Sequence, residues 1–141
     1  MACVPSEGAA MVDVVSRPVA VIARRNAKKG APYELGHVIP RFAVHNGVPR
    51  ARRRFMDGRL YPESSQIPVE KVSRPDMPEG VPRTWILTLR DRTHSAREQR
   101  ASIEAIGGVQ RIIPIDTCHG LMVSEPERLA EIPVERCCAR S

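Results

Sequence analysis

The stretch that decides the fold runs from residue 84 to residue 115 and reads TWILTLRDRTHSAREQRASIEAIGGVQRIIPI. It begins with an apolar run, residues 84–89, whose length is typical of a buried strand, and a second apolar run follows at residues 109–115. Between the two runs the pattern predicts a helix over residues 96–106. The order strand, helix, strand is typical of a right-handed crossover, so we expect the two strands to lie parallel and adjacent.

The ends of this helix have specific signals. Ser95 and Glu98 have the Ser-x-x-Glu spacing of a capping box, in which each side chain hydrogen bonds to the backbone N–H of the other residue. Gly107 and Gly108 follow the last helical residue. Glycine commonly ends a helix because it adopts the left-handed backbone conformation without strain.

A second Ser-x-x-Glu pair predicts one more helix. Ser124 and Glu127 repeat the spacing, and the helix that they begin should run toward Cys138. Pro126 falls in the first turn, where proline is tolerated. Pro133 falls inside the helix and is expected to kink or end it, at a cost of roughly 3 kcal/mol.

The regular part of the chain therefore has the order βαβα, and the fold class is α/β. Parallel strands are normally buried on both faces and flanked by further strands. Two strands and two helices do not satisfy that requirement. We expect this part to be the edge of a larger sheet.

The chain before the first strand is basic and rich in proline. Residues 1–60 contain 11 Lys or Arg and 4 Asp or Glu, a net charge of +7, whereas residues 61–141 have a net charge of −1. Residues 62–82 contain five prolines, each of which restricts its own backbone and that of its predecessor, so an irregular connector or part of a lid is expected. The expected division is residues 1–35, unassigned and either disordered or translated out of frame; residues 36–81, lid-like or an irregular connector; and residues 82–141, the regular α/β segment.

Three short elements are expected within the basic part. The apolar residues Val19–Ala23 favour a short strand, and the cations that follow beside Gly30 indicate a loop. A short helix is expected over residues 50–56, ended by Gly58; it holds the arginines Arg50, Arg52, Arg53 and Arg54. Clustered arginines can neutralise nucleic-acid phosphates, but Phe55 is the one aromatic residue among them and no nucleic-acid-binding motif surrounds them. A solvated helix face is the favoured interpretation.

Two residues with complementary chemistry follow the two predicted strands. Asp91 comes directly after the first strand, and His119 comes shortly after the second. Neighbouring strands lie about 4.8 Å apart, and the loops at the carboxyl ends of parallel strands are the usual place for sites in α/β folds. A carboxylate that contacts an imidazole fixes its tautomer and stabilises the imidazolium. Asp91 and His119 are therefore the candidate acid and base of a Ser-His-Asp triad.

Three segments together resemble the C-terminal part of α/β-hydrolases, over residues 82–136. They are VPRTWILTLRDR at 81–92, QRASIEAIGG at 99–108 and IPIDTCHGLMVSEPERLAEI at 113–132. The branch they resemble holds the esterases related to plant methylesterases and hydroxynitrile lyases. In this family a His-x-x-Met-x-Ser-x-Pro pattern opens the final helix, and His119, Met122, Ser124 and Pro126 match it. The resemblance implies that Asp91 is the triad acid and His119 the triad base, and residues 54–80 loosely resemble the family's lid.

The sequence departs from the family in ways that affect function. The family's Gly-x-Ser-x-Gly nucleophile elbow does not occur around any upstream serine; these are Ser6, Ser16, Ser64, Ser65 and Ser73. The oxyanion hole has no recognisable counterpart. The lyase branch places lysine directly after the histidine, whereas Gly120 stands here. The resemblance therefore implies ester hydrolysis, with an incomplete set of catalytic groups.

Three hypotheses for function follow. The first is a fragment of a serine hydrolase that acts on small carboxylic esters, supplies the acid and histidine, and is inactive alone. The second is a non-catalytic basic protein that binds nucleic acid through residues 17–60. The third is a subunit that completes a hydrolase by docking with a separate chain that bears the nucleophile.

The remaining residue types support neither a metal site nor a membrane span. Cys118 and His119 are adjacent, so both cannot easily reach one ion, and no second ligand pair has the usual spacing. We expect no metal or other cofactor. No apolar segment is long enough to cross a membrane, and the four cysteines show no disulfide spacing, so a reducing cytoplasm is expected. Cys118 is expected to pack as a small apolar residue beneath the histidine loop, and His94 to be solvent-exposed.

Overall fold

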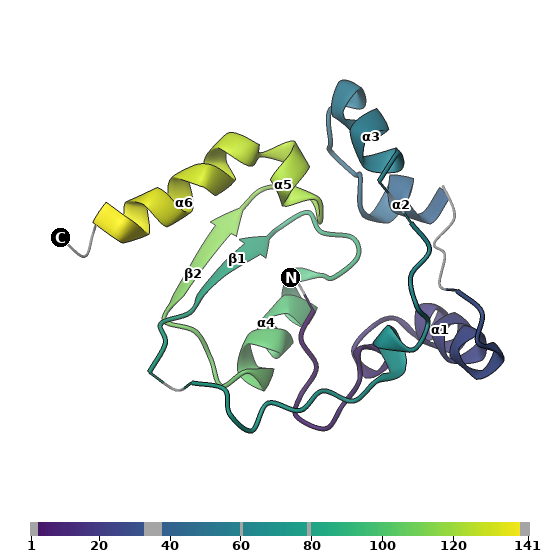
Figure 1. Ribbon diagram of the computed structural model, residues 1–141. Coiled ribbons are helices and arrows are strands. Elements are labelled where there is room, and N and C mark those ends of the chain that lie inside the picture. The colour runs from purple at the N-terminus through teal and green to yellow at the C-terminus, as the bar shows by residue number, and fades with distance from the viewer. Residues whose placement is uncertain (1–2, 33–37, 60, 79, 139–141) are drawn as a thin grey trace.

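A two-stranded parallel sheet lies at the centre of the regular segment (Figure 1). The computed structural model describes residues 3–32, 38–59, 61–78 and 80–138. Strand β1 spans Thr84–Thr88 and strand β2 spans Arg111–Ile115. Their register pairs Thr88 with Ile115, so the two strands end side by side. The expected parallel pair is confirmed.

Helices cover both sides of this sheet. Helix α4, Ala96–Ala105, connects the strands, and α5, Leu121–Ser124, and α6, Pro126–Cys138, follow β2. Figure 1 shows α4 on one side of the sheet and α5 and α6 on the other. Trp85 and Leu87 of β1 form a buried cluster with Ile103 of α4. Burial of each such side chain contributes about 1.5–3 kcal/mol, which favours this arrangement over an exposed strand.

Helix α4 begins and ends as its signals predict. The Ser95 hydroxyl accepts the Glu98 N–H at 3.3 Å, and the Glu98 carboxylate accepts the Ser95 N–H at 2.7 Å. After the helix, Gly107 and Gly108 have φ angles of +78° and +87°, and the Gly108 N–H donates to the Ile103 carbonyl at 2.9 Å. The capping box and the glycine stop therefore position both ends of the crossover.

The segment before residue 33 forms a helix where a strand and a loop were expected. A 3-10 turn, η1, covers Met11–Asp13, and helix α1 covers Arg17–Lys29. Their small apolar residues form a second buried cluster, which consists of Ala10, Val12, Ala20 and Ala23. The expected strand at Val19–Ala23 and the loop after it are both wrong.

Position explains why Pro18 does not prevent this helix. Pro18 is the second residue of α1, where a backbone N–H has no partner within the helix, so its absence has little cost. Gly30, with a φ of +63°, then ends the helix.

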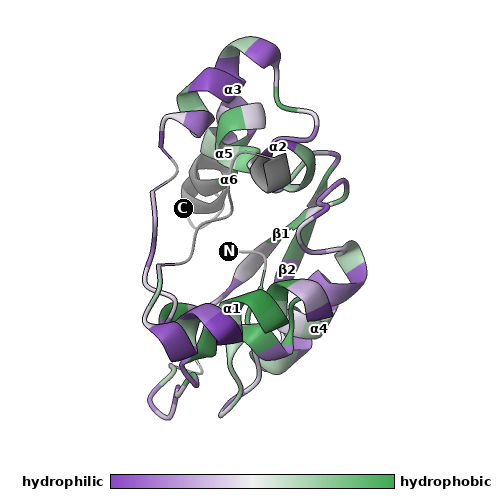
Figure 2. Ribbon diagram, turned by 90° about the vertical axis from the view of Figure 1, so that its right-hand side faces the viewer, coloured by the Kyte–Doolittle hydropathy of each residue, from purple (hydrophilic) through white to green (hydrophobic). Residues whose placement is uncertain are grey.

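The middle of the chain is mostly irregular. Helix α2 covers Val38–Ala43, α3 covers Arg50–Asp57, and a 3-10 turn, η2, covers Ile67–Val69. Helix α3 confirms the short helix expected from residue 50. Figure 2 shows that α1 and α3 carry many hydrophilic residues. The expected boundary at residue 35 lies outside the described residues.

The last helix continues past its internal proline and does not begin at the expected serine. Helix α6 continues to Cys138, so Pro133 does not end it. Ser124 belongs to α5 and does not cap α6, because its hydroxyl lies 2.6 Å from the buried hydroxyl of Thr117. The expected N-cap at Ser124 is therefore wrong. None of the helices in the described part of the chain is long and apolar enough to cross a membrane.

Candidate active site

The carboxylate of Asp91 is enclosed by hydrogen-bond donors directly after β1. Its side chain is 0% exposed. Oδ1 accepts the backbone N–H groups of Thr93 and His94 at 2.8 and 2.9 Å, and Oδ2 accepts the Thr88 hydroxyl at 3.1 Å. These bonds hold the carboxylate in one orientation, with Oδ2 facing the loop that follows β2.

His119 lies in that loop and completes the pair. Its Nδ1 is 2.8 Å from Oδ2 of Asp91. The two residues are 28 positions apart in the sequence and meet because β1 and β2 end side by side. The His119 side chain is 31% exposed, so the pair reaches from a buried carboxylate to the surface. The structure thus brings together both predicted site residues.

The charge state of Asp91 determines which nitrogen of His119 is basic. Burial raises the pKa of Asp91, but the hydrogen bonds from His119, His94 and Thr93 outweigh it and hold that pKa below its ordinary value. An ionised carboxylate only accepts hydrogen bonds, so Nδ1 of His119 must carry the proton. The unprotonated Nε2 is then free to accept a proton from a reacting group.

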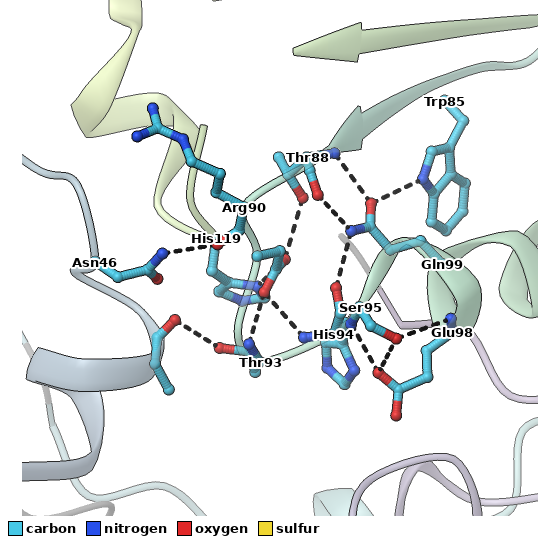
Figure 3. Close-up of polar contacts among 12 residues, drawn as sticks. Asn46, Trp85, Thr88, Arg90, Thr93, His94, Ser95, Glu98, Gln99 and His119 are labelled. Carbon is cyan, nitrogen blue, oxygen red and sulfur yellow. Dashed lines mark hydrogen bonds and ion pairs between the residues drawn. The ribbon is translucent and has the colours of Figure 1, made fainter. Parts of the chain in front are cut away.

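Arg90 connects the loop after β1, which holds Asp91 (the acid loop), to the loop after β2, which holds His119 (the histidine loop). Its Nη2 donates to the Asp116 carbonyl at 2.6 Å, and its Nε lies 3.0 Å from the Asp116 carboxylate. The backbone N–H of Arg90 donates to the Thr117 carbonyl at 2.9 Å. From the middle of the chain, the Asn46 side chain donates to the Arg90 carbonyl at 2.7 Å, as Figure 3 shows. The strand ends and both loops are therefore linked.

His94 is buried beside the pair, which overturns the expectation that it is exposed. The residue is 6% exposed, and its ring centroid lies 5.8 Å from that of His119. Burial and the charge of His119 lower the pKa of His94, against the opposing effects of Asp91 and Glu98. The chain bends back here because Asp91 accepts the His94 N–H, and this local turn carries the ring inward.

A hollow of about 470 Å³ lies beside His119. Its walls come from β1, from the loop and helix after His119, and from residues packed around them; they are Val44, Met56, Thr84, Trp85, Ile86, Thr88, Gly120, Leu121, Met122, Val123 and Leu129. A Cβ at Gly120 would lie 2.7 Å from Cε of Met56, so the absent side chain lets α3 approach the histidine loop. The hollow is mostly apolar and opens toward the candidate base.

No nucleophile completes the pair within the described residues. None of their Ser, Thr or Cys side chains hydrogen bonds to His119; Ser95 bonds to Glu98, and Ser124 bonds to Thr117. Cys118 is buried, as expected. Burial and the charge of Glu98 raise the pKa of the Cys3 thiol to about 11, which disfavours a thiolate. The described part of the chain also holds no group of three or more potential metal ligands.

The comparisons with known proteins concern the fold of the chain. No family model and no curated protein matches the sequence. Among solved structures, a histidine-to-alanine mutant of polyneuridine aldehyde esterase matches with a TM-score of 0.62 at 17% identity, over 75% of this chain and 43% of that one. A second structure of polyneuridine aldehyde esterase matches with a TM-score of 0.57 at 16% identity, over 70% of this chain and 40% of that one.

The chain has the fold of part of an α/β-hydrolase. It spans less than half of the length of the solved esterases that it matches. The small α/β arrangement, with one parallel strand pair and helices on both sides, is the portion of the hydrolase fold that is present.

Two residues that support the pair were missed from the sequence. Thr88 is the last residue of β1 and donates to Asp91, and Gln99 is a fully buried residue of α4. A signal for Gln99 was present, since it lies in line with Ala96 and Ile103 on the apolar face of the helix. A polar residue at such a position must be hydrogen-bonded, which makes it a candidate for a structural role at the site.

Proposed function

We propose that residues 82–136 are the acid–histidine part of a serine hydrolase that acts on carboxylic esters. The observation that carries the proposal is the 2.8 Å contact between Asp91 and His119 at the carboxyl ends of two parallel strands. The similarity to part of an esterase fold supports the same reading. In this proposal Asp91 orients His119, and Nε2 of His119 exchanges protons with the nucleophile and the leaving group.

The chemistry follows from these roles. Nε2 removes the proton of a serine hydroxyl as its oxygen attacks the ester carbonyl, and the imidazolium that forms is stabilised by the Asp91 carboxylate. The imidazolium then protonates the departing alkoxide, which leaves an acyl-serine. A water molecule, deprotonated by the same Nε2, cleaves the acyl group, and the serine recovers its proton.

We propose that the nucleophilic serine of the triad is not among the described residues of this chain. No described hydroxyl contacts His119, and this chain spans 43% of the esterase that it matches. We therefore propose that the chain alone does not turn over ordinary esters, and that the intact enzyme takes a small-molecule ester. A separate nucleophile-bearing chain is the alternative source of the serine.

An activated ester tests the base directly. The unprotonated Nε2 of His119 should attack p-nitrophenyl acetate, releasing p-nitrophenolate and forming an acetyl-imidazole that water cleaves. We expect hydrolysis by the wild type to fall to the background of the other histidines in His119→Ala. Equal rates in the two proteins would contradict the proposed role of His119.

A fluorophosphonate probe tests the missing serine. Because such probes react with activated serines, we expect no labelling of the chain alone. Labelling that disappears in His119→Ala would mean that this chain contains its own nucleophile, and the fragment proposal would be wrong.

The nucleic-acid alternative has less support from the arginine run. Arg52 donates to the Val123 and Ser124 carbonyls at 3.1 and 3.4 Å, and Arg53 donates to the Val48 carbonyl at 2.8 Å. These two guanidinium groups are therefore engaged within the molecule. Duplex binding that weakens steeply with salt would revive the alternative.

We also propose that the protein is located in the cytoplasm. Cys3 and Cys118 are buried free thiols, which fits a reducing cytoplasm.

A further inference from the structure

The side chain of Gln99 is fully buried and makes hydrogen bonds with both of its polar ends. Its Oε1 accepts the Thr88 N–H at 3.2 Å and lies 3.5 Å from the indole nitrogen of Trp85. Its Nε2 donates to the carbonyls of Thr88 and His94, each at 2.9 Å. Figure 3 shows the amide between Thr88, Trp85 and the start of α4. The two short bonds from Nε2 to carbonyl oxygens fix which end of the amide is the donor.

The partners of Gln99 are also the residues that hold Asp91. Thr88, whose backbone N–H and C=O both bond to Gln99, donates its hydroxyl to Oδ2 of Asp91. His94, whose carbonyl accepts from Gln99, donates its N–H to Oδ1 of Asp91. The Gln99 amide therefore bridges the two ends of the acid loop, from the last residue of β1 to the residue before the α4 cap.

Apart from Asp91 itself, whose carboxylate accepts from both Thr88 and His94, no other described side chain bridges these two points. The hydrogen bonds of Gln99 also explain why this polar side chain is buried among apolar ones, since an amide with satisfied donors and acceptors is stable there. An apolar replacement would leave two carbonyls and one N–H without partners. The capping box fixes the start of α4 and thereby the position from which Gln99 reaches the loop.

We propose that Gln99 is a positioning residue that sets the orientation of the Asp91 carboxylate toward His119. Gln99 does not touch the reacting atoms; it acts by fixing Thr88 and His94, whose donors determine where Oδ1 and Oδ2 lie. This role rests on the proposed function of the Asp91–His119 pair, but its test does not require ester hydrolysis.

The test uses proton and ¹⁵N NMR of the full chain at low temperature. A ring N–H that donates to a carboxylate gives a proton resonance far downfield of the amides, and His119→Ala identifies the one from His119. Two variants remove the bridge: Gln99→Met keeps the length without polar atoms, and Gln99→Glu keeps the shape but places a carboxylate against two carbonyls. Gln110→Met is the matched control, because its side chain accepts the Arg83 N–H at 2.6 Å at the opposite end of β1.

We expect the wild type and Gln110→Met to show the downfield His119 proton, and both Gln99 variants to lose it. The amides of Thr93 and His94 should also exchange faster with solvent in the Gln99 variants, while amides of β2 stay protected as evidence that the fold persists. If one Gln99 variant fails to fold, the other decides. Retention of the downfield proton and of Thr93 and His94 protection in a folded Gln99 variant would overturn the positioning role and leave the pair intact. Absence of the downfield proton from the wild type would instead contradict the hydrogen bond between Asp91 and His119, and with it both proposals.

Discussion

The Asp91 side chain is the most strongly constrained group of the candidate site. It accepts hydrogen bonds from Thr88, Thr93, His94 and His119, and it has no exposed surface. A carboxylate in this position stabilises the folded state only while it is ionised. Its lowered pKa therefore links the stability of the fold to pH as well as orienting His119.

Asp91→Asn should destabilise the chain at neutral pH. The amide places a donor among donors, so we expect the free energy of unfolding to fall by about 1–3 kcal/mol. The folded pKa of Asp91 is depressed, so its contribution is present above the unfolded value of about 3.9 and is lost as the pH falls through the folded pKa. Urea unfolding at a series of pH values should show the two proteins converging at low pH. A constant difference down to strongly acidic pH would contradict this account.

His94 should also reduce stability as the pH falls, but over a higher pH range than Asp91. Its folded pKa is lowered by burial and by His119, so the unfolded state binds more protons below the unfolded value of about 6.5. Stability is thus lost as the pH falls from about 7 toward the folded pKa. His94→Phe removes this titration, and its loss of stability between pH 7 and pH 5 should be smaller than that of the wild type. Parallel urea midpoints for both proteins over that range would show the idea to be wrong.

Among the secondary-structure elements, α4 has the clearest local determinants. Ser95 and Glu98 each satisfy a backbone donor that the helix leaves unpaired. We expect Ser95→Ala to lower the free energy of unfolding by about 1 kcal/mol. Because Glu98 bonds to the same residue, the double variant with Glu98→Ala should cost less than the sum of the two single variants. Additive values from urea unfolding would mean that the two halves of the capping box act independently.

Helix α3 is attached to the histidine side of the sheet through Arg52. This guanidinium group bonds to carbonyls at the end of α5 and lies 3.6 Å from the Glu127 carboxylate in α6. Arg52→Ala should therefore release α3, and amides of residues 52–58 should exchange faster with solvent, while those of β1 and α4 are unchanged. Arg54→Ala, an exposed arginine of the same helix, is the control. Equal exchange in the two variants would show that Arg52 does not hold α3 in place.

The sequence predicted elements best where local signals and tertiary packing agree. β1, α4 and β2 combine apolar runs of the right length with a capping box and a glycine stop, and the structure confirms all three. Helix α1 was missed because its β-branched residues favour strands, although packing of Ala20 and Ala23 decides for the helix. At Ser124 a tertiary hydrogen bond to Thr117 replaces the expected cap, which no local pattern reveals.

Across the whole molecule, chain order alone predicted which two residues meet. Parallel strands place Asp91 and His119 at one edge, and the structure confirms their contact. The supporting residues were not predictable in the same way. Asn46 reaches Arg90 from 44 positions away, and Thr88 and Gln99 act through side-chain hydrogen bonds that strand order does not specify. The catalytic role of the pair stays a prediction, since the hydrolase fold accounts for its position and not for its activity.

The free side of β1 should determine how the chain behaves in solution. Within the described residues the sheet has two strands, so β1 pairs on one side only. β2 contains Pro114, whose missing N–H is tolerated at a sheet edge and discourages pairing there. An unpaired strand with apolar neighbours is a template for other chains, so we expect self-association between about 1 µM and 1 mM.

A charge beside that side of β1 should suppress the association. Ile86 belongs to β1 and its side chain lines the hollow. Ile86→Lys places a charge on this edge strand, which discourages pairing with a second chain. Ile112→Lys adds the same charge on β2, at a side chain that is already exposed, and should leave the association unchanged. Sedimentation velocity over the concentration series measures both effects. A wild type that stays monomeric throughout would mean that the two-stranded sheet needs no further strand, which would count against its being the edge of a larger hydrolase sheet.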